Sequence, residues 1–258
     1  MPIELTLVLF VIIGFLSGLL GGLLGIGGGV VTVPFLYYFY RYTGEHPEKL
    51  MQVAACTSLA VAFVTAGMST YYHLRHKSID FSILKWMFPF LMIGCVVGAF
   101  IAEHVATEIL SHIFATAAAI LGIYFFFPKL PHLHIASKPN ASLSLFALAI
   151  GSLSSMLGIG GGIVTFPILL GYHVPVLQAS STSSAATWIS TGTGTVAFLI
   201  IVWAFPGYID LMAWTALSIG SIVTTKIGVK LARILDIRLI KRIFGGCLVL
   251  IALSMYLL

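Results

Sequence analysis

The stretch "LLGIGGGVVTVPFL", residues 23–36, returns almost unchanged as "MLGIGGGIVTFPIL", residues 156–169. When Leu24–Leu36 is aligned with Leu157–Leu169, ten of the thirteen positions are identical. Neither copy carries a charge, and each runs from three adjacent glycines into a threonine and a proline. Self-similarity at a fixed separation is the signature of an internal repeat. The two stretches therefore predict a chain made of two halves built on one plan.

The composition indicates the environment of these halves. Hydrophobic residues make up 59% of the 258 residues and charged residues only 8%, against roughly 25% in ordinary soluble domains. The 71 residues between Lys138 and Asp210 include no Asp, Glu, Lys or Arg, whereas one helical crossing of a bilayer takes about 20 apolar residues. Long apolar runs favour helices over the short alternating strands of a barrel. We therefore predict an all-α integral membrane protein.

The repeat extends through both halves. "AACTSLA" at 54–60 aligns with "ASSTSSA" at 179–185. Farther along, "IG" at 93–94 matches "IG" at 219–220, and "IF" at 113–114 matches "IF" at 243–244. These matches divide one transmembrane domain into a first membrane repeat over residues 1–128, a polar linker over 129–142 and a second membrane repeat over 143–258. Each half holds five apolar segments, predicted as helices over 5–24, 29–40, 51–72, 84–102 and 109–127, and over 143–157, 162–171, 177–204, 210–231 and 239–258.

Basic residues predict that the two halves have opposite orientations. Three lie in or beside the loop after the third segment of the first half, and the matching loop at 205–210 has none. After the fourth segment the pattern reverses, because 103–108 has no Lys or Arg while 226–242 has six. With the two lysines of the linker, eleven of the thirteen basic residues then share one face, which the positive-inside rule makes cytoplasmic. The linker 129–142 is therefore expected in the cytoplasm and both termini outside.

Inversion requires an odd number of crossings in each half. The second segments, 29–40 and 162–171, are too short to cross. We therefore expect the first two segments of each half to form a re-entrant helical hairpin that turns at the glycines, followed by three transmembrane helices. Two complete crossings followed by three also fit the parity. Short, Gly/Pro-interrupted segments at matching positions of two halves mark the binding site of many repeat-built transporters.

The glycine phrase predicts a broken helix. Each glycine costs about 1 kcal/mol of helix stability relative to alanine, and it allows backbone conformations closed to other residues. A helix that restarts at Val30 or Ile163 would present free N–H groups, which attract anions. The phrase has neither the spacing of a dinucleotide fingerprint nor the lysine of a P-loop, and close helix packing is the alternative interpretation. The glycines predicted to bind substrate are Gly27, Gly28, Gly29, Gly160, Gly161 and Gly162.

Hydroxyl groups accompany both glycine phrases. Thr32 and Thr165 fall in the first turn of the restarted helices, where they can cap backbone N–H groups or contact a solute. The segment 177–204 carries a neutral polar stripe of serines and threonines, thinner in the first half. Hydroxyls in membrane helices often only bond their own backbone or a neighbouring helix. Our predicted substrate-binding hydroxyls are those of Thr32 and Thr165 and of the matched pairs Thr57, Ser58 and Thr182, Ser183.

Other candidate groups are weaker. Cys56, Cys95 and Cys247 lie in apolar segments without metal-binding or disulfide spacing and are expected to pack as small hydrophobes, although Cys56 could react with a sulfur oxyanion. Lys226 could draw an anion inward or extend to the membrane interface. We predict no metal site, because the histidine pairs lack carboxylate or thiolate neighbours. We also predict no cofactor and no nucleic-acid partner. The histidine pairs are His73 with His76 and His132 with His134.

The doubled "LGIGGG…VT.P.L" phrase and the Thr-Ser pairs resemble the sulfite exporter TauE/SafE family, over almost the whole chain. The resemblance implies a prokaryotic cytoplasmic-membrane carrier for sulfite, sulfoacetate or related organosulfonates, most often working outward. It carries over only to the glycines, Thr32, Thr165 and the two Thr-Ser pairs. Ala55 and Cys56 replace the serines found at Ser180 and Ser181, so the halves need not play equal roles.

These observations predict a secondary transporter of small sulfur-containing anions, not an enzyme. Alternating access at a midplane site formed by helix N-termini and Ser/Thr hydroxyls is the expected mechanism, with a small anion and the lipid bilayer as partners. The alternatives are an uptake carrier for another small solute or ion, and an integral-membrane enzyme or assembly subunit. The sequence leaves the exact solute, the coupling ion and the oligomeric state open, a homodimer included.

Overall fold

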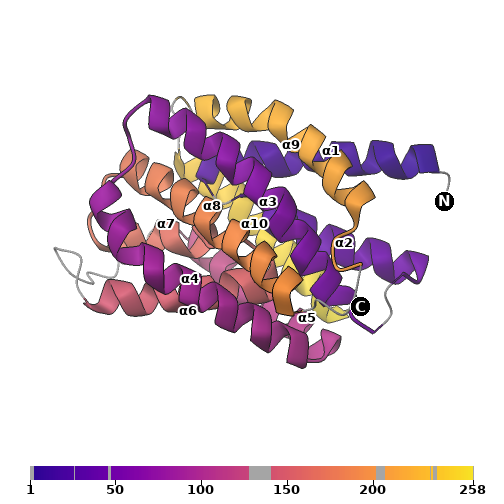
Figure 1. Ribbon diagram of the computed structural model, residues 1–258. Helices are drawn as coiled ribbons and strands as arrows, with labels where there is room; N and C mark the ends of the chain where they lie inside the picture. Colours follow the sequence, from indigo (N-terminus) through magenta and orange to yellow (C-terminus); the bar gives the residue numbers. More distant parts are fainter. Residues whose placement is uncertain are drawn as a thin grey trace.

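The computed structural model describes residues 3–25, 27–45, 48–127, 141–201, 207–232, 234 and 237–257. These residues form helices, and no strand occurs among them. The first half contributes α1 (Ile3–Leu24), α2 (Gly29–Thr43), α3 (Leu50–Arg75), α4 (Phe81–His104) and α5 (Thr107–Phe126). The second half contributes α6 (Ala141–Leu157), α7 (Gly162–Gly171), α8 (Val176–Ile201), α9 (Leu211–Leu231) and α10 (Ile237–Leu257) (Figure 1).

The ten helices occupy the ten predicted apolar segments. Six of them, α1, α3, α4, α5, α8 and α9, are long and apolar enough to cross a membrane by length and composition. With 15 and 10 residues, α2 and α7 reach only about 22 and 15 Å at 1.5 Å per residue, short of a hydrocarbon core about 30 Å thick. The predicted all-α integral membrane protein is confirmed, and the chain is a multi-pass membrane protein.

The first helix of each half packs against a helix of the other half. α1 of the first half packs along α9 of the second, and α6 of the second packs along α4 of the first (Figure 1). Glycines allow both close approaches, since a methyl group at Gly220 would overlap the backbone of Val11 and one at Gly94 would overlap that of Leu148. These are the "IG" glycines matched in the sequence. Each half therefore completes its packing only against the other.

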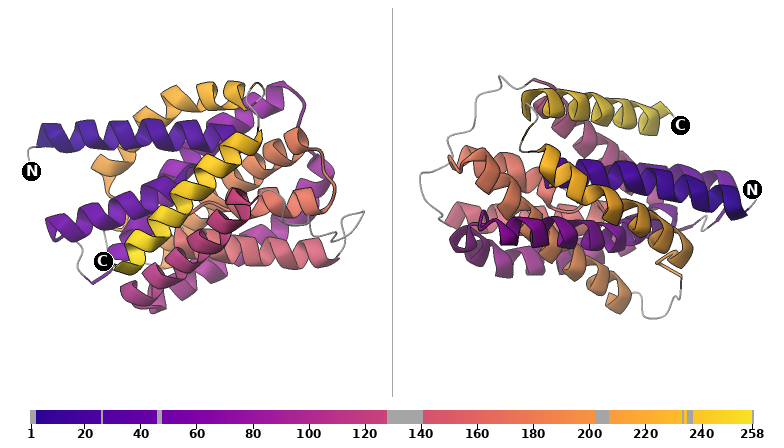
Figure 2. Two further views of the ribbon diagram at one scale, coloured as in Figure 1. Left: turned by 180° about the vertical axis from the view of Figure 1, so that it is seen from behind. Right: turned by 90° about the horizontal axis from the view of Figure 1, so that it is seen from above.

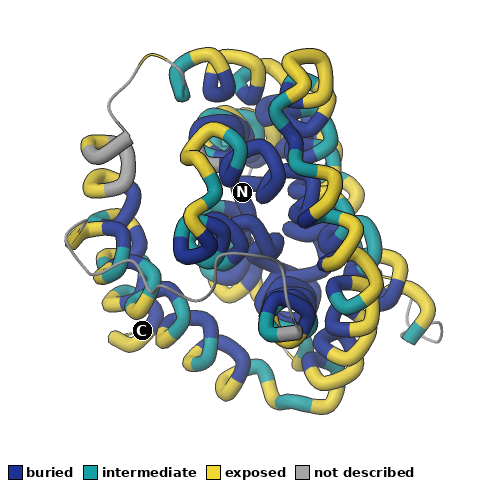
Figure 3. Tube along the Cα trace, turned by 90° about the vertical axis from the view of Figure 1, so that its left-hand side faces the viewer, coloured by how far each residue is buried: buried dark blue, intermediate teal, exposed yellow. Residues whose placement is uncertain are grey.

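The third helices of the two halves, α3 and α8, pack against each other inside the bundle. α5 and α10 form a further pair, visible side by side in Figure 2. Figure 3 shows the buried positions turned inward and the exposed positions on the outside. Large hydrophobic side chains cover the outer helix faces, for example Phe88, Ile93 and Phe100 of α4. Such apolar exposure would be unusual in water, and in a bilayer these faces meet lipid.

The first two helices of each half run back alongside each other. The start of α1 and the end of α2 line one cavity, through Ile3 and Thr6 on one side and Tyr42 and Glu45 on the other. In the second half, the hydroxyls of Ser142 and Tyr172 join the start of α6 to the end of α7. α1 is itself long enough to cross a bilayer, so length does not separate the two topologies that the sequence left open. The re-entrant placement, the inverted orientation of the halves and their boundaries stay predictions, and the linker lies mostly outside the described residues.

Candidate functional site

The glycine phrases interrupt the helices in both halves. α1 ends at Leu24 and α2 begins at Gly29, while α6 ends at Leu157 and α7 begins at Gly162. The helix breaks are confirmed. Both helices restart where the predicted segments 29–40 and 162–171 begin, one residue before Val30 and Ile163. The left-handed φ angles fall at Gly25 (70°), Gly27 (77°), Gly28 (78°), Gly158 (70°) and Gly160 (75°). Only glycine adopts this conformation without penalty, which accounts for the glycine density.

The two breaks meet inside the bundle. A methyl group at Gly29 would lie 2.5 Å from the carbonyl oxygen of Gly158 and 2.6 Å from that of Ile159. The start of α2 therefore faces the carbonyls of the second break. Four cavities between the helices are lined by other residues. The breaks are packed against each other in this state.

Hydroxyl groups of the first half join the two breaks. Ser58 Oγ of α3 donates to the carbonyl oxygen of Gly158, at 2.9 Å. Thr32 Oγ1 of α2 lies 2.6 Å from Ser58 Oγ and also 3.3 Å from the carbonyl oxygen of Gly29. All of these residues are fully buried or nearly so. The structure therefore brings together Thr32, Ser58, Gly29 and the second glycine phrase.

The second half repeats part of this arrangement. Ser183 Oγ of α8 donates to the carbonyl oxygen of Gly162, at 2.9 Å, as Ser58 does more distantly to that of Gly29, at 3.5 Å. Thr165 Oγ1 donates to the carbonyl oxygen of Gly161, at 2.8 Å. The matched serines of the two halves thus both contact the first residue of a restarted helix.

Thr57 and Thr182 lie elsewhere. Thr57 Oγ1 accepts a hydrogen bond from the backbone N–H of Asp210, at 3.1 Å, and Thr182 Oγ1 accepts one from that of Asp80, at 2.9 Å. The two aspartates cap α4 and α9, because their carboxylates accept from backbone N–H groups of the first turn. The structure does not bring these two threonine hydroxyls to the glycine breaks.

The capping aspartates were missed at the level of sequence. Asp80 and Asp210 each stand immediately before an apolar run, which is a recognised signal for a helix N-terminus. They also occupy matching places in the repeat. The sequence could therefore have predicted the caps, although not the threonines that hold them.

The electrostatics of the site come from neutral groups. The first N–H groups of a helix have no partner within it, and the aligned peptide dipoles give that end a partial positive charge. Within the described residues, no hydrogen bond occupies the backbone N–H of Gly29, Val30, Gly162 or Ile163. The hydroxyls of Ser58, Ser183 and Thr165 donate to carbonyl oxygens in this structure, so they become donors for a solute only when those bonds are released. Such a site can hold a small anion without a full countercharge.

Most of the polar stripe on α8 serves its own helix. Thr187, Thr191 and Thr195 each donate to the carbonyl oxygen four residues earlier, at 2.7 to 2.8 Å. Two members also reach other elements: Thr187 Oγ1 lies 3.2 Å from the carbonyl oxygen of Gly25, and Ser184 Oγ lies 3.0 Å from Ser69 Oγ on α3. The stripe therefore mainly bonds its own helix backbone and, at two positions, neighbouring elements, which was the alternative interpretation.

The remaining candidates are separate from the breaks. Cys56 and Cys95 are buried, Cys247 is exposed, and Lys226 lies on the exposed side of α9. His73 and His76 line a cavity at the end of α3. No group of three or more metal-ligating side chains is found among the described residues. His132 and His134 lie outside them.

Comparisons with known proteins agree with a multi-pass membrane protein. The profile of the family described as Sulfite exporter TauE/SafE matches residues 10–255. The chain belongs to the TauE/SafE family.

Several relatives are similar along most of their length. A probable membrane transporter protein of Haemophilus influenzae is 28% identical, over 97% of this chain and 98% of its own. One of Methanocaldococcus jannaschii is 29% identical over 88% and 86% of the two chains, and YunE of Bacillus subtilis is 26% identical over 94% and 97%. No solved structure matches the chain. The relatives' names support membrane transport and leave the solute open.

Proposed function

We propose that this protein is a secondary transporter that exports small sulfur-containing anions, such as sulfite, sulfoacetate or other organosulfonates, across the cytoplasmic membrane. Membership of the TauE/SafE family supports this proposal. The observation that carries it is the meeting of two interrupted helices, one from each half, with Ser58 of the first half bonded to Gly158 of the second.

The proposed binding site consists of the two breaks and the hydroxyls beside them. Sulfite and sulfonate oxygens accept hydrogen bonds, and backbone N–H groups at helix starts are suitable donors. Neutral hydroxyls add contacts while allowing release, because no opposite full charge traps the anion. Thr57 and Thr182 position helix caps in this proposal instead of contacting the solute. The proposed contact residues are Gly27, Gly28, Gly29, Thr32, Ser58, Gly160, Gly161, Gly162, Thr165 and Ser183.

The proposed mechanism is alternating access. The breaks separate to admit the anion and close around it, while the two halves move relative to each other. Export follows from the membrane potential, since an inside-negative potential expels an anion with about 2.3 kcal/mol per charge per 100 mV. In this proposal the linker 129–142 lies in the cytoplasm and both termini lie outside.

Flux from proteoliposomes tests this function. Vesicles holding purified protein are loaded with sulfite, sulfoacetate or another small organosulfonate, and efflux is followed under an imposed potassium-diffusion potential. We expect efflux that is faster than from protein-free vesicles and that increases with an inside-negative potential. Equal efflux from both kinds of vesicle for every anion of the panel would refute anion transport. Faster movement of cations than anions would favour the alternative carrier.

A further inference from the structure

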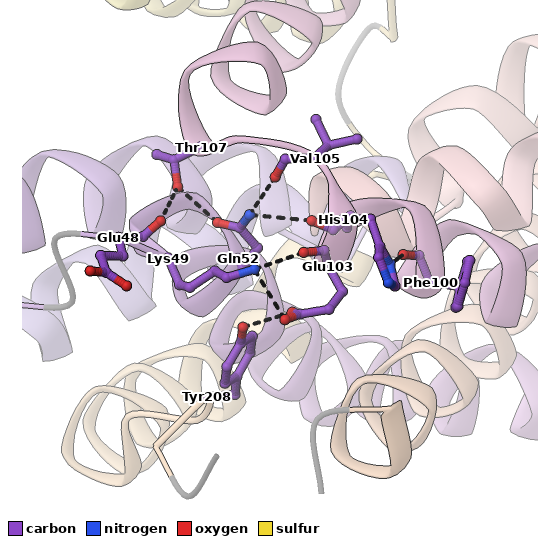
Figure 4. Close-up of polar contacts among 10 residues, drawn as sticks. Glu48, Lys49, Gln52, Phe100, Glu103, His104, Val105, Thr107 and Tyr208 are labelled. Atoms are coloured by element: carbon purple, nitrogen blue, oxygen red, sulfur yellow. Dashed lines mark hydrogen bonds and ion pairs between the residues drawn. The ribbon is translucent and has the colours of Figure 1, made fainter. Parts of the chain in front are cut away.

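A polar cluster fastens three segments at one end of the bundle (Figure 4). Lys49 Nζ, just before α3, forms an ion pair with Glu103 Oε1 of α4 at 3.0 Å and donates to the Glu103 carbonyl oxygen at 2.7 Å. Tyr208, in the segment before α9, donates its hydroxyl to Glu103 Oε2 at 2.7 Å. Glu103 is therefore held from two sides, by one element of each half.

A second layer of bonds lies just below this cluster. Gln52 of α3 donates to the carbonyl oxygens of Ala102 and Val105, at 3.2 and 2.8 Å, and accepts from Thr107 Oγ1 at 2.9 Å (Figure 4). These bonds tie the start of α3 to the turn between α4 and α5. Both polar atoms of the Gln52 side chain therefore have hydrogen-bond partners, and the side chain is fully buried.

Cys56 comes next along α3 after the residues of the polar cluster and of the second layer of bonds. Cys56 follows Gln52 by one helical turn of α3, so both side chains share a face, and neither is exposed. Burial, the hydrogen bond to Glu103 and the charge of Glu103 raise the pKa of the Tyr208 hydroxyl, and Cys56 contributes as a nearby group. Cys56 therefore lies one turn farther from Lys49 along α3 than Gln52 does, and its side chain is fully buried.

The internal repeat identifies the equivalent place in the other half. Tyr208 stands two residues before the capping Asp210, as Ser78 stands two before Asp80. Gln52 stands five residues before Thr57, as Leu177 stands five before Thr182. The separation between the "IG" pair at 93–94 and Glu103 equals that between the pair at 219–220 and Val229. Glu103 and Val229 are therefore equivalent positions of the repeat.

The equivalent place is open. Ser78, Leu177 and Val229 line a cavity of about 470 Å³, together with Leu23, His73, His76, Val176, Ser180 and Ala232. Val229 and Leu177 have no polar groups with which to reproduce the bonds of Glu103 and Gln52. The Ser180 hydroxyl is buried and has no hydrogen-bond partner within the described chain. The cluster of Lys49, Glu103 and Tyr208 is thus fastened by an ion pair, and none of the three lines the cavity of about 870 Å³ beside it. The repeat-related place itself is hollow.

We infer that Lys49, Glu103 and Tyr208 form the gate that closes one end of the transport route. The cavity lined by Leu177 and Val229 is then the open entrance at the other end of the route. This inference rests on the proposed transport function. The Lys49 side chain is 39% exposed and that of Glu103 17%, and partly exposed ion pairs of this kind are weak. The gate can therefore open at small cost when the halves move.

Modification of Cys56 tests the gate without any solute. In a C95A/C247A background, Cys56 is the only thiol, and the protein in lipid nanodiscs exposes both ends to a polar maleimide. We expect slow labelling of the background protein and labelling about tenfold faster in E103Q, because modification follows the population of open molecules. Y208F should accelerate labelling as well.

The matched control is E48Q. Glu48 is exposed, and its carboxylate points away from the cluster in Figure 4, so the same chemical change should leave the labelling rate unaltered. The charge swap K49E/E103K should return the rate toward the background, which a merely unfolded E103Q could not explain. Equal rates for E103Q and the background, or equal acceleration by E48Q and E103Q, would overturn the gate. Because no anion is used, failure here is distinguishable from failure of the flux experiment.

Discussion

Ser58 in α3 donates a hydrogen bond to the carbonyl oxygen of Gly158, which lies 100 residues away in the other half, across 2.9 Å. This bond joins a hydroxyl of one half to the interrupted helix of the other. In the proposed mechanism the breaks separate to admit an anion, and this bond is then released or exchanged for one to the solute.

The first prediction concerns Ser58 itself. Removing its hydroxyl in S58A deletes one buried neutral hydrogen bond, worth about 1 kcal/mol, and one donor of the proposed site. We expect about a fivefold rise in the solute concentration for half-maximal flux, which is that energy expressed as an equilibrium constant. Concentration-dependent efflux from proteoliposomes measures it. T215V is the control, because Thr215 bonds only carbonyls of its own helix on the exposed side of α9. An unchanged half-saturating concentration in S58A would exclude Ser58 from the site.

The second prediction separates positioning from binding at Thr57 and Thr182. T57V and T182V each remove the acceptor of one capping backbone N–H, at a cost of about 1 kcal/mol of stability. We expect both variants to melt at lower temperature in detergent, with the half-saturating concentration of the solute unchanged. T195V, whose hydroxyl bonds its own helix, should melt like the unmodified protein. A weakened affinity without a lower melting temperature would instead indicate direct contact with the solute.

The third prediction compares two glycines of similar backbone conformation. Gly158 and Gly44 have φ angles of 70° and 73°, but a methyl group at Gly158 would lie 2.5 Å from Ala55 Cα, and one at Gly44 would meet nothing within 4 Å. Both alanine variants incur the left-handed penalty of about 1–2 kcal/mol. Only G158A adds overpacking, of about 1–3 kcal/mol. We therefore expect a clearly lower melting temperature and less monodisperse protein for G158A than for G44A. Similar behaviour of the two would mean that the second break is loosely packed.

The fourth prediction concerns the charge of the solute. For a carrier without a coupled ion, a potential of 100 mV supplies about 2.3 kcal/mol per charge, which corresponds to an equilibrium gradient of about 50-fold for a monovalent anion. A divalent anion should reach the square of that ratio. Distribution of labelled anions across vesicles clamped at several potentials gives the exponent directly. An exponent below the charge of the anion would reveal a cation moving with it.

The ten helices and the two breaks could be predicted because they depend on local composition. Apolar runs bounded by polar residues set the helix limits, and three neighbouring glycines after Leu24 and after Leu157 stop a helix wherever it lies. The exchange of α1 and α6 between the halves was not predictable in this way, because the small residues that allow it, such as Gly94 and Gly220, look alike whatever helix they contact.

The hydroxyls of the site were only partly predictable. The Thr-Ser pairs were recognised by their repetition, yet the two members of each pair have different partners. Ser58 and Ser183 bond to the breaks. Thr57 and Thr182 bond to the capping aspartates. Adjacent residues of a helix point in directions about 100° apart, so the two members of a pair face different neighbours here. Which member faces the break depends on the rotation of α3 and α8, and packing partners far along the chain determine that rotation.

The packing of α1 on α9 has a consequence for biosynthesis. Gly14 contacts the backbone of Leu217, and roughly 200 residues must be made between them, which takes about 10–40 s at ordinary elongation rates. During that interval α1 has been delivered to the membrane while its native neighbour does not yet exist. Lipid, the insertion machinery or another chain must cover its glycine face until the ribosome has nearly finished. Truncated chains ending before α9 should therefore be recognised and degraded by membrane quality control.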